Sequence, residues 1–306
     1  MVSKVIKKNK KSNLAYWLML VPGLLSLLIF NYLPMFGSII AFKDYNYFQG
    51  IFKSPWVGFK HFEFFFTSND LFRLLRNTIL YNFAFMFLIA FLASAVVALM
   101  LYEVKSKLLV KFYQTSMLLP YFISWVIVAA IVLLILNPST GFLNSLLSVF
   151  GAEPVMWYSN PSYWPVILFL VELWKSVGMG SLYFYASLLS IDPCLFEAAE
   201  LDGAGKFKQI WYISVPEMMP MACVLLVTRV GSILGGDFGL YYQVTMDSGA
   251  LYPTTDVMGT YIYRGLAAGN VSSTAAIGLF QSVVGLALVI VTNKVIKKIS
   301  PKNAMF

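Results

Sequence analysis

Three charged residues fall inside otherwise apolar segments of the chain, and their types suit recognition of a polar solute. Glu172 and Lys175 lie three residues apart, so on a helix they share one face. Arg229 lies in a later apolar segment. A charge in hydrocarbon is costly, so each is expected to face a cavity, a partner subunit or another charge. With Trp174, they could line a path for a sugar, whose faces are apolar and whose edges carry hydroxyls.

The same residues also allow a purely structural interpretation. Glu172 and Lys175 could form an internal ion pair that fixes helix packing, while Arg229 reaches toward the cytoplasmic interface. The sequence leaves both interpretations open. Under the first, an apolar replacement of Glu172 or Lys175 should impair uptake while the protein still assembles with its partners.

A possible nucleotide-binding motif fails on inspection. The run Gly203–Phe207, GAGKF, has a Gly-Lys pair, as a Walker A loop does. That loop also needs a glycine five positions before the Gly of the pair, where Glu200 stands. It needs Ser or Thr after Lys206, where Phe207 stands. We therefore expect the chain to bind no nucleotide by this route and to carry no nucleotide cofactor of its own.

Catalytic and metal chemistry have little support. His61 is the only histidine, which nearly excludes a histidine-based catalytic or metal cluster. Cys194 and Cys223 are most simply free thiols. We therefore predict no catalytic residue and no metal ligand.

The longest clearly polar run between the fourth and fifth apolar segments, residues 192–216, predicts a helix–turn–helix loop. Asp192 can cap a helix that begins at Pro193 and continues to about Leu201. Gly203 can supply the left-handed residue that ends it. Residues 206–214 predict a second short helix, and Pro216 opens the next apolar segment.

The spacing within this loop resembles the EAA loop of binding-protein-dependent ABC importers. Glu-Ala-Ala is followed after three residues by Gly203, then after nine by Ile213, and then by Val215-Pro216. Family members usually have Leu where Val215 stands. The EAA loop docks as a coupling helix in a groove of the ATPase subunit. By resemblance, the ATPase-coupling residues are Glu197, Ala198, Ala199, Asp202, Gly203, Ile213 and Pro216.

The resemblance, closest to maltose-permease-like carbohydrate permeases, also implies an architecture and partners. It implies an all-α integral membrane protein with six transmembrane helices, the type I ABC importer permease fold. The chain would sit in the bacterial cell membrane with two ATPase subunits, which bind ATP and magnesium. A second, different permease subunit and an extracellular solute-binding protein would complete the importer. The implied solute is a carbohydrate, most simply an oligosaccharide.

Composition independently indicates a membrane protein, because hydrophobic residues make up 59% of the chain and charged residues only 12%. We expect a basic tail at 1–13, a first helix and aromatic external loop at 14–75, a five-helix core at 76–292, and a basic tail at 293–306. Short surface helices are expected at Phe142–Phe150 and Asp256–Leu266. The six expected spans are Leu14–Ile40, Asn77–Leu101, Met117–Leu136, Tyr163–Leu189, Pro216–Leu234 and Ala275–Thr292.

Charge predicts the orientation of these spans. With a cytoplasmic N-terminus, the inner segments carry 14 lysines and arginines and the outer segments carry 6. The bias places both termini and the 192–216 loop in the cytoplasm. It also explains the net charge of +8 better than binding to nucleic acid does.

Two other functions remain open. A self-sufficient secondary transporter or channel often has inverted repeats around an ion site, and none is evident here. A membrane enzyme acting on lipid-linked sugars would need grouped acids, His or Cys at an interface. The scattered carboxylates of Asp237, Asp247 and Asp256 give that function weak support.

Overall fold

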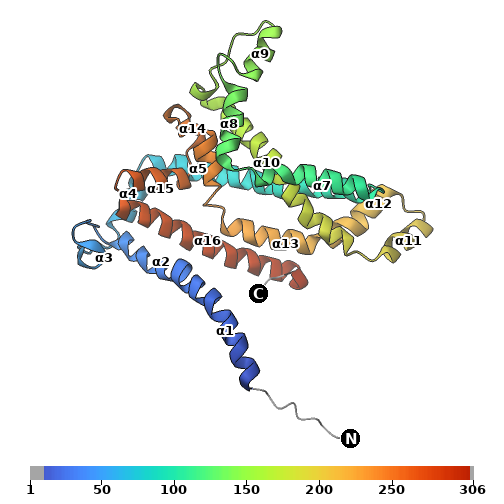
Figure 1. Ribbon diagram of the computed structural model, residues 1–306, viewed down its shortest axis with the longest axis horizontal. Coiled ribbons are helices and arrows are strands. Elements are labelled where there is room, and N and C mark those ends of the chain that lie inside the picture. The colour runs from blue at the N-terminus through green and yellow to red at the C-terminus, as the bar shows by residue number, and fades with distance from the viewer. Residues whose placement is uncertain (1–9, 304–306) are drawn as a thin grey trace.

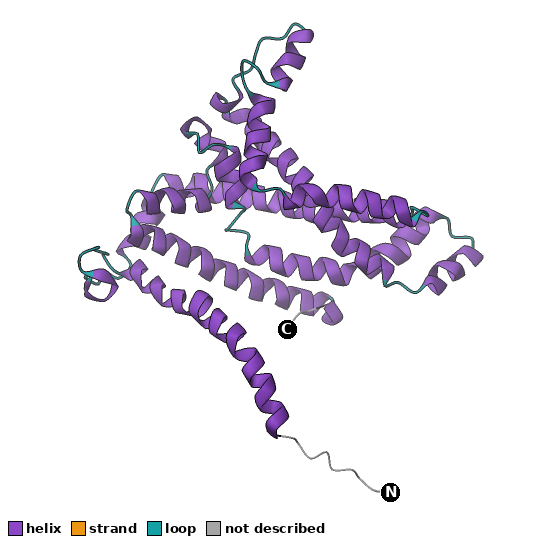
Figure 2. Cartoon of the chain, viewed as in Figure 1, coloured by secondary structure: helices purple, strands orange, loops and turns teal. Residues whose placement is uncertain are grey.

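The computed structural model describes residues 10–303, with side chains described from residue 16 onward. This part of the chain is built of helices and contains no β-strand, only an isolated bridge between Lys43 and Trp56 (Figure 2). Lys4, Lys7 and Lys8 of the expected basic tail lie outside the described residues. The first helix already begins at Lys10, within that expected tail.

Five helical segments are long and apolar enough to cross a membrane. They cover Tyr16–Phe42, Asp70–Tyr102, Pro161–Leu189, Lys206–Gly231 and Val271–Ile299. These contain, respectively, α1 (Lys10–Leu27), α5 (Asp70–Ala84) with α6 (Ser94–Tyr102), α10 (Trp164–Leu189), α13 (Val215–Gly231) and α16 (Val271–Ile299). Five of the six expected spans are thus present as continuous helical segments. Asp70–Tyr102 and Val271–Ile299 extend beyond the expected bounds at both ends, whereas Lys206–Gly231 starts before the expected Pro216 and ends before the expected Leu234.

The expected third span, Met117–Leu136, is not one straight helix. It is divided between α7 (Lys107–Phe122) and α8 (Trp125–Leu136), which meet at an angle of 95°. Ile123 and Ser124 between them are extended, and the Ser124 hydroxyl caps α8 by accepting from the Ile127 backbone N–H at 3.4 Å. The run is apolar enough overall that hydropathy gave no sign of this break, although Pro120 and Ser124 lie beside it.

A second correction concerns the loop at 192–216. Its first helix, α11 (Pro193–Leu201), has the expected bounds. The expected second short helix is instead the start of the next span, because α12 (Lys206–Gln209) continues through a π-helical turn, Ile210–Ser214, into α13. Pro216 falls in the first turn of α13, where a missing backbone N–H is tolerated, so the helix does not need to restart there.

The helix α10 lies at the centre of the core and packs against α6, α7 and α13. Its buried residues recur every three or four positions and form one stripe facing its neighbours. They are Trp164, Leu168, Glu172, Lys175, Gly178, Ser181, Phe184 and Leu188. The two charges noted in the sequence therefore face the protein interior.

By contrast, α1 leaves the bundle at an angle (Figure 1). Only 6% of the apolar window of its span is buried within the chain. The 192–216 loop lies at one end of the molecule, at the right of Figure 1, and α16 runs from the opposite end toward that side. The short helices α3 (Gly50–Lys53), α4 (Lys60–Thr67) and α15 (Met258–Ala267) lie toward the opposite end.

Both expected surface helices are present, as α9 (Phe142–Val149) and α15. The expected loop at 235–274 is more structured than predicted. It contains a π-helix, Gly239–Val244, whose Leu240, Tyr241 and Val244 are buried against α8. It also contains the short helix α14 (Tyr252–Thr255).

Candidate functional site

A cavity of about 430 Å³ lies where α5, α7, α10 and α13 converge. Three charged residues line it: Glu172 from α10, Arg229 from α13, and Asp237 from the segment that follows α13. The other lining residues are mainly polar or aromatic and include Asn82, Phe85, Tyr121, Ser176, Ser232 and Phe238. The cavity therefore combines charge, hydrogen-bonding groups and aromatic rings within the helical core.

Glu172 contributes a carboxylate oxygen to this cavity that has no hydrogen-bond partner in the part of the chain that the structure describes. Its side chain is buried, and Oε1 accepts a hydrogen bond from the Ser176 hydroxyl at 2.6 Å. Its other oxygen, Oε2, is buried without a hydrogen-bond partner among the described residues. Buried polar atoms are nearly always paired, so an unpaired oxygen on a cavity-lining residue suits a ligand hydroxyl.

Lys175 has a different place from the one that its spacing to Glu172 suggested. Its Nζ donates to the carbonyl oxygens of Pro120 and Tyr121, both at 3.1 Å, and to that of Ile123. It also lies 4.8 Å from the ring centroid of Trp125. Among the ion pairs of residues 16–303, none joins Lys175 to Glu172. The lysine instead donates to three carbonyls at the break after α7, of which that of Pro120 also accepts from the Ile123 backbone N–H at 3.2 Å.

Of the four path residues proposed from the sequence, the structure brings two to the cavity. Glu172 and Arg229 line it, whereas Lys175 and Trp174 do not. Lys175 binds the backbone carbonyl of Tyr121 rather than lining the cavity itself. Trp174 is 44% exposed and lies outside the buried stripe of α10. The suggested internal ion pair between Glu172 and Lys175 is wrong.

Asp237 is the site residue that the sequence did not point to. Its Oδ2 accepts from Trp125 Nε1 at 3.0 Å, and its Oδ1 accepts from the Gly239 backbone N–H at 2.9 Å. Gly239 lies against the Trp125 ring, where a Cβ atom would come within 2.0 Å of it. Asp237 thus links the break after α7 to the cavity wall, although in sequence it is one more acid in a loop.

The other two scattered carboxylates are already engaged. Asp256 is fully buried and pairs with Arg264 at 2.6 Å and with Arg73 at 3.2 Å. Asp247 pairs with Arg264 at 2.9 Å. The three acids considered for an interfacial enzyme therefore divide between the cavity and an ion-pair network on α5 and α15.

The 192–216 loop has the local structure that its residues predict. Asp192 Oδ1 accepts from the Cys194 backbone N–H at 3.0 Å and so caps α11. Gly203 has φ +74°, the left-handed conformation that ends helices. The Ala204 backbone N–H closes the turn by donating to the Ala199 carbonyl at 2.8 Å.

The coupling residues expected here differ in exposure. Glu197, Ala198, Asp202 and Gly203 are exposed, while Ala199 is half-buried. Ile213 packs with Phe196 onto the cluster around Phe184 and Met218 and so ties the loop to the core. Large apolar side chains are also exposed on this loop, with Leu201 at 90%, Tyr212 at 80% and Phe207 at 74%. Exposed apolar side chains of this size on a polar loop are typical of interaction sites.

Comparisons with known proteins agree with this architecture. The family model described as binding-protein-dependent transport system inner membrane component matches residues 87–303. Protein LplB of Bacillus subtilis is 39% identical over 92% of this chain and 88% of its own. The B. subtilis polygalacturonan/rhamnogalacturonan transport system permease protein YteP is 35% identical over 96% of this chain and 94% of its own.

A solved structure shows the same fold. It is a bacterial alginate ABC transporter in complex with an alginate pentasaccharide-bound periplasmic protein. The matching chain is 35% identical, with a TM-score of 0.86, over 96% of this chain and 98% of that one.

Proposed function

The chain belongs to the family of binding-protein-dependent transport system inner membrane components, the permease subunits of ABC importers, and we propose that it imports an acidic oligosaccharide driven by a separate ATPase. The observation that carries this proposal is the cavity shared by Glu172, Arg229 and Asp237 within the helical core. Membrane helices tolerate such charges where they line a solute path.

The chemistry of the cavity fits a carboxylated sugar. The guanidinium group of Arg229 can bind a carboxylate through paired N–H donors. The free Oε2 atom of Glu172 can accept from sugar hydroxyls, and the rings of Phe85 and Phe238 can cover apolar sugar faces. The names of two matches support this class, since one names polygalacturonan and the other alginate.

We assign the 192–216 loop to the contact with the ATPase. The exposed helix α11 has the form of a helix that docks in a groove, and Leu201, Phe207 and Tyr212 supply apolar area for such a contact. ATP and magnesium bind to the ATPase subunits rather than to this chain. When those subunits close, they displace α11. Because Ile213 packs onto the core, this displacement is transmitted to the membrane-spanning helices.

The orientation of the chain and its other partners follow from this assignment. Both termini and the 192–216 loop face the cytoplasm, in line with the charge bias. A second, different permease subunit completes the path, and α1 offers it an uncovered apolar surface. An extracellular binding protein delivers the solute to the opposite end of the molecule, and access to the path alternates during the cycle.

Uptake into proteoliposomes tests this function. The chain is co-purified with its ATPase, partner permease and binding protein, and uptake of trigalacturonate is measured with and without ATP inside the vesicles. We expect uptake only with ATP. ATP-independent uptake would favour a secondary transporter, and chemical conversion of a lipid-linked sugar would favour an enzyme.

A charge reversal tests the coupling site separately. Glu197→Arg should reduce ATP-driven uptake at least tenfold and reduce ATPase recovery during purification. If Glu197 pairs with a basic group in the ATPase groove, the introduced arginine is repelled by that group. Glu153→Arg is the matched control, since Glu153 is also exposed but lies in the loop after α9. Equal uptake by both variants would remove Glu197 from the coupling contact.

A further inference from the structure

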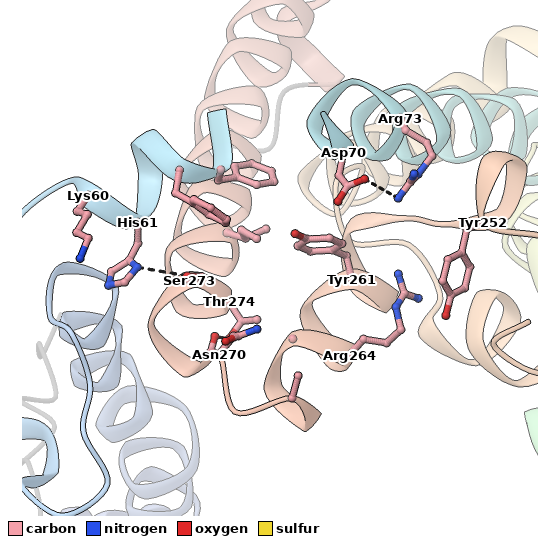
Figure 3. A pocket seen from close by; sticks show the side chains of 15 residues that line it. Lys60, His61, Asp70, Arg73, Tyr252, Tyr261, Arg264, Asn270, Ser273 and Thr274 are labelled. Atoms are coloured by element: carbon pink, nitrogen blue, oxygen red, sulfur yellow. Dashed lines mark hydrogen bonds and ion pairs between the residues drawn. The ribbon is translucent and has the colours of Figure 1, made fainter. Parts of the chain in front are cut away.

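A second cavity, of about 610 Å³, lies near the end of the molecule opposite the 192–216 loop. It is enclosed by α4, the start of α5, α15 and the start of α16 (Figure 3). Its lining includes Lys60, His61, Arg73, Tyr252, Tyr261 and Arg264. None of the residues that line the central cavity belongs to it.

Two buried hydrogen-bond donors in this lining have no acceptor. Four side-chain nitrogen or oxygen atoms are buried without a partner among the described residues, and two of them are His61 Nε2 and Arg73 Nε. The other ring nitrogen of His61, Nδ1, lies 3.3 Å from the Ser273 hydroxyl. When Nδ1 accepts from that hydroxyl, Nε2 carries the proton and must donate. Arg73 Nε, and His61 Nε2 in this tautomer, therefore call for an acceptor.

The cationic side of the cavity is fixed in place before any ligand binds. Arg73 Nη2 pairs with Asp70 at 2.9 Å and with the buried Asp256 at 3.2 Å. Arg264 pairs with Asp256 at 2.6 Å and lies 4.1 Å from the ring centroid of Tyr252. Such a network holds the donors in one geometry and lowers the entropic cost of binding.

The rest of the lining adds charge and flat apolar surfaces. Lys60, Arg73 and Arg264 line the cavity together with one carboxylate, that of Asp70. The ammonium group of Lys60 lies 3.6 Å from Asp44 in a largely exposed ion pair. The rings of Phe64 and Tyr261 come from opposite walls, α4 and α15. Donors and cations beside aromatic rings suit a ligand with a carboxylate, several oxygen acceptors and an apolar face.

We propose that this second cavity is an entry subsite that binds one uronate unit of the oligosaccharide before the chain reaches the central cavity. The proposal rests on the function proposed above, and it adds a site that recognises the carboxylate outside the helical core. The unpaired Nε of Arg73 donates to the carboxylate, and Lys60 exchanges its exposed pairing with Asp44 for the same group. His61 donates to an oxygen of the sugar, and Phe64 and Tyr261 cover its faces.

Protection of an engineered cysteine tests binding directly. Ala268 is an exposed residue of the cavity lining, so the Ala268→Cys variant, made with Cys194→Ser and Cys223→Ser, carries a reporter thiol there. The complete transporter in nanodiscs, without binding protein and without ATP, is reacted with a maleimide. We expect trigalacturonate to slow the reaction and neutral galactotriose to have no effect. The matched reporter is Ala152→Cys, an exposed alanine in the loop after α9, which neither sugar should protect.

Two substitutions then identify the groups that bind. Lys60→Met and His61→Phe should each raise the trigalacturonate concentration for half-protection about tenfold, the effect of losing one strong hydrogen bond. Lys53→Met is the control, because Lys53 is an exposed lysine of α3 outside the cavity lining and should leave half-protection unchanged.

The outcomes separate this proposal from the proposed function. Absence of protection, or equal protection by both sugars, would overturn the entry subsite even if ATP-driven uptake of trigalacturonate were normal. Protection by inorganic phosphate as strong as that by trigalacturonate would likewise overturn it and indicate an anion site for lipid headgroups. If the complete transporter showed no ATP-driven uptake while protection persisted, the proposed function would fail and the uronate site would stand.

Discussion

The ammonium nitrogen of Lys175 lies 3.1 Å from the carbonyl oxygen of Pro120, where α7 stops and the chain turns by 95° into α8. A helix end leaves carbonyl groups without partners, and in an apolar core water cannot satisfy them. A lysine from the neighbouring α10 supplies three donors in one group and binds three carbonyls at this helix end. Among the described residues, only the Pro120 carbonyl of these three has a backbone donor as well, the Ile123 N–H. The buried charge thereby stabilises the break.

Removing this lysine should therefore weaken the fold before it weakens solute recognition. Lys175→Met keeps the length of the side chain but removes the donor to the Tyr121 and Ile123 carbonyls, at a cost of about 2 kcal/mol or more. The Pro120 carbonyl keeps its bond from the Ile123 backbone N–H. We expect a melting temperature several degrees lower for the purified complex, measured by size-exclusion thermal challenge. Lys111→Met, at an exposed position of α7, should leave it unchanged. Equal melting temperatures for the Lys175→Met and Lys111→Met variants would contradict the role of Lys175 in capping α7.

Arg229 should affect transport without affecting the fold. It lines the central cavity and has no ion-pair partner within residues 16–303. If it binds a solute carboxylate, Arg229→Gln should raise the KM for trigalacturonate uptake about tenfold or more, the worth of a charge-assisted hydrogen bond. Thermal stability should stay within a degree or two. A KM that stays the same would remove Arg229 from the path.

Sequence patterns predicted the parts of the fold that depend on local rules. Apolar length gave five of the six spans, and the Asp192-Pro193 start and Gly203 end gave the bounds of α11 exactly as observed. The matching fold, at a TM-score of 0.86, confirms the resemblance read from the 192–216 loop.

The parts that depend on tertiary contacts could not be predicted in this way. The bend after Phe122 is stabilised by Lys175, which is more than fifty residues away along the chain. Pro120 and the cap residue Ser124 mark it locally, but the length of the apolar run favoured a single span. Asp237 became a site residue because Trp125 and Gly239 hold it at the cavity. Glu172 could be predicted, because its carboxylate lies in an apolar helix. Asn82 could have been proposed on the same ground, although less strongly, because its amide is polar but uncharged and also lies in an apolar span.

Close contact between α7 and α10 should be a sensitive point of the fold. A Cβ atom at Gly178 would come within 2.0 Å of the Met117 carbonyl oxygen, and backbone cannot move aside cheaply. We therefore expect Gly178→Ala to force the two helices apart and to lower the yield of folded complex at least several-fold.

The matched control for that change is Gly278→Ala. Gly278 also lies inside a membrane-spanning helix, but nothing within 4 Å would meet its Cβ atom. The helix propensity of alanine favours it there by about 1 kcal/mol. Yields of folded complex, measured by fluorescence-detected gel filtration, should fall for Gly178→Ala alone, and a similar fall in both would point to helix flexibility rather than packing.

The two native cysteines allow the orientation to be measured with little alteration of the chain. Cys194 is exposed in α11, and Cys223 lies half-buried in α13, so Cys223→Ser leaves one accessible thiol in the 192–216 loop. A membrane-impermeant maleimide should label Cys194 in inside-out vesicles and leave it unlabelled in intact cells. Labelling in intact cells would place the loop outside and would contradict both its contact with the ATPase and the orientation.

The rate of this labelling should also depend on pH in a defined way. The hydrogen bond to Asp192 and its negative charge raise the pKa of the Cys194 thiol, so less reactive thiolate is present at pH 7 than for an ordinary cysteine. Asp192→Asn removes the charge but keeps an oxygen that can cap α11, so the pKa should fall and labelling at pH 7 should become faster. The two rates should converge as the pH rises and both thiols ionise. If the Asn variant instead labels more slowly at pH 7, Asp192 does not control the thiol.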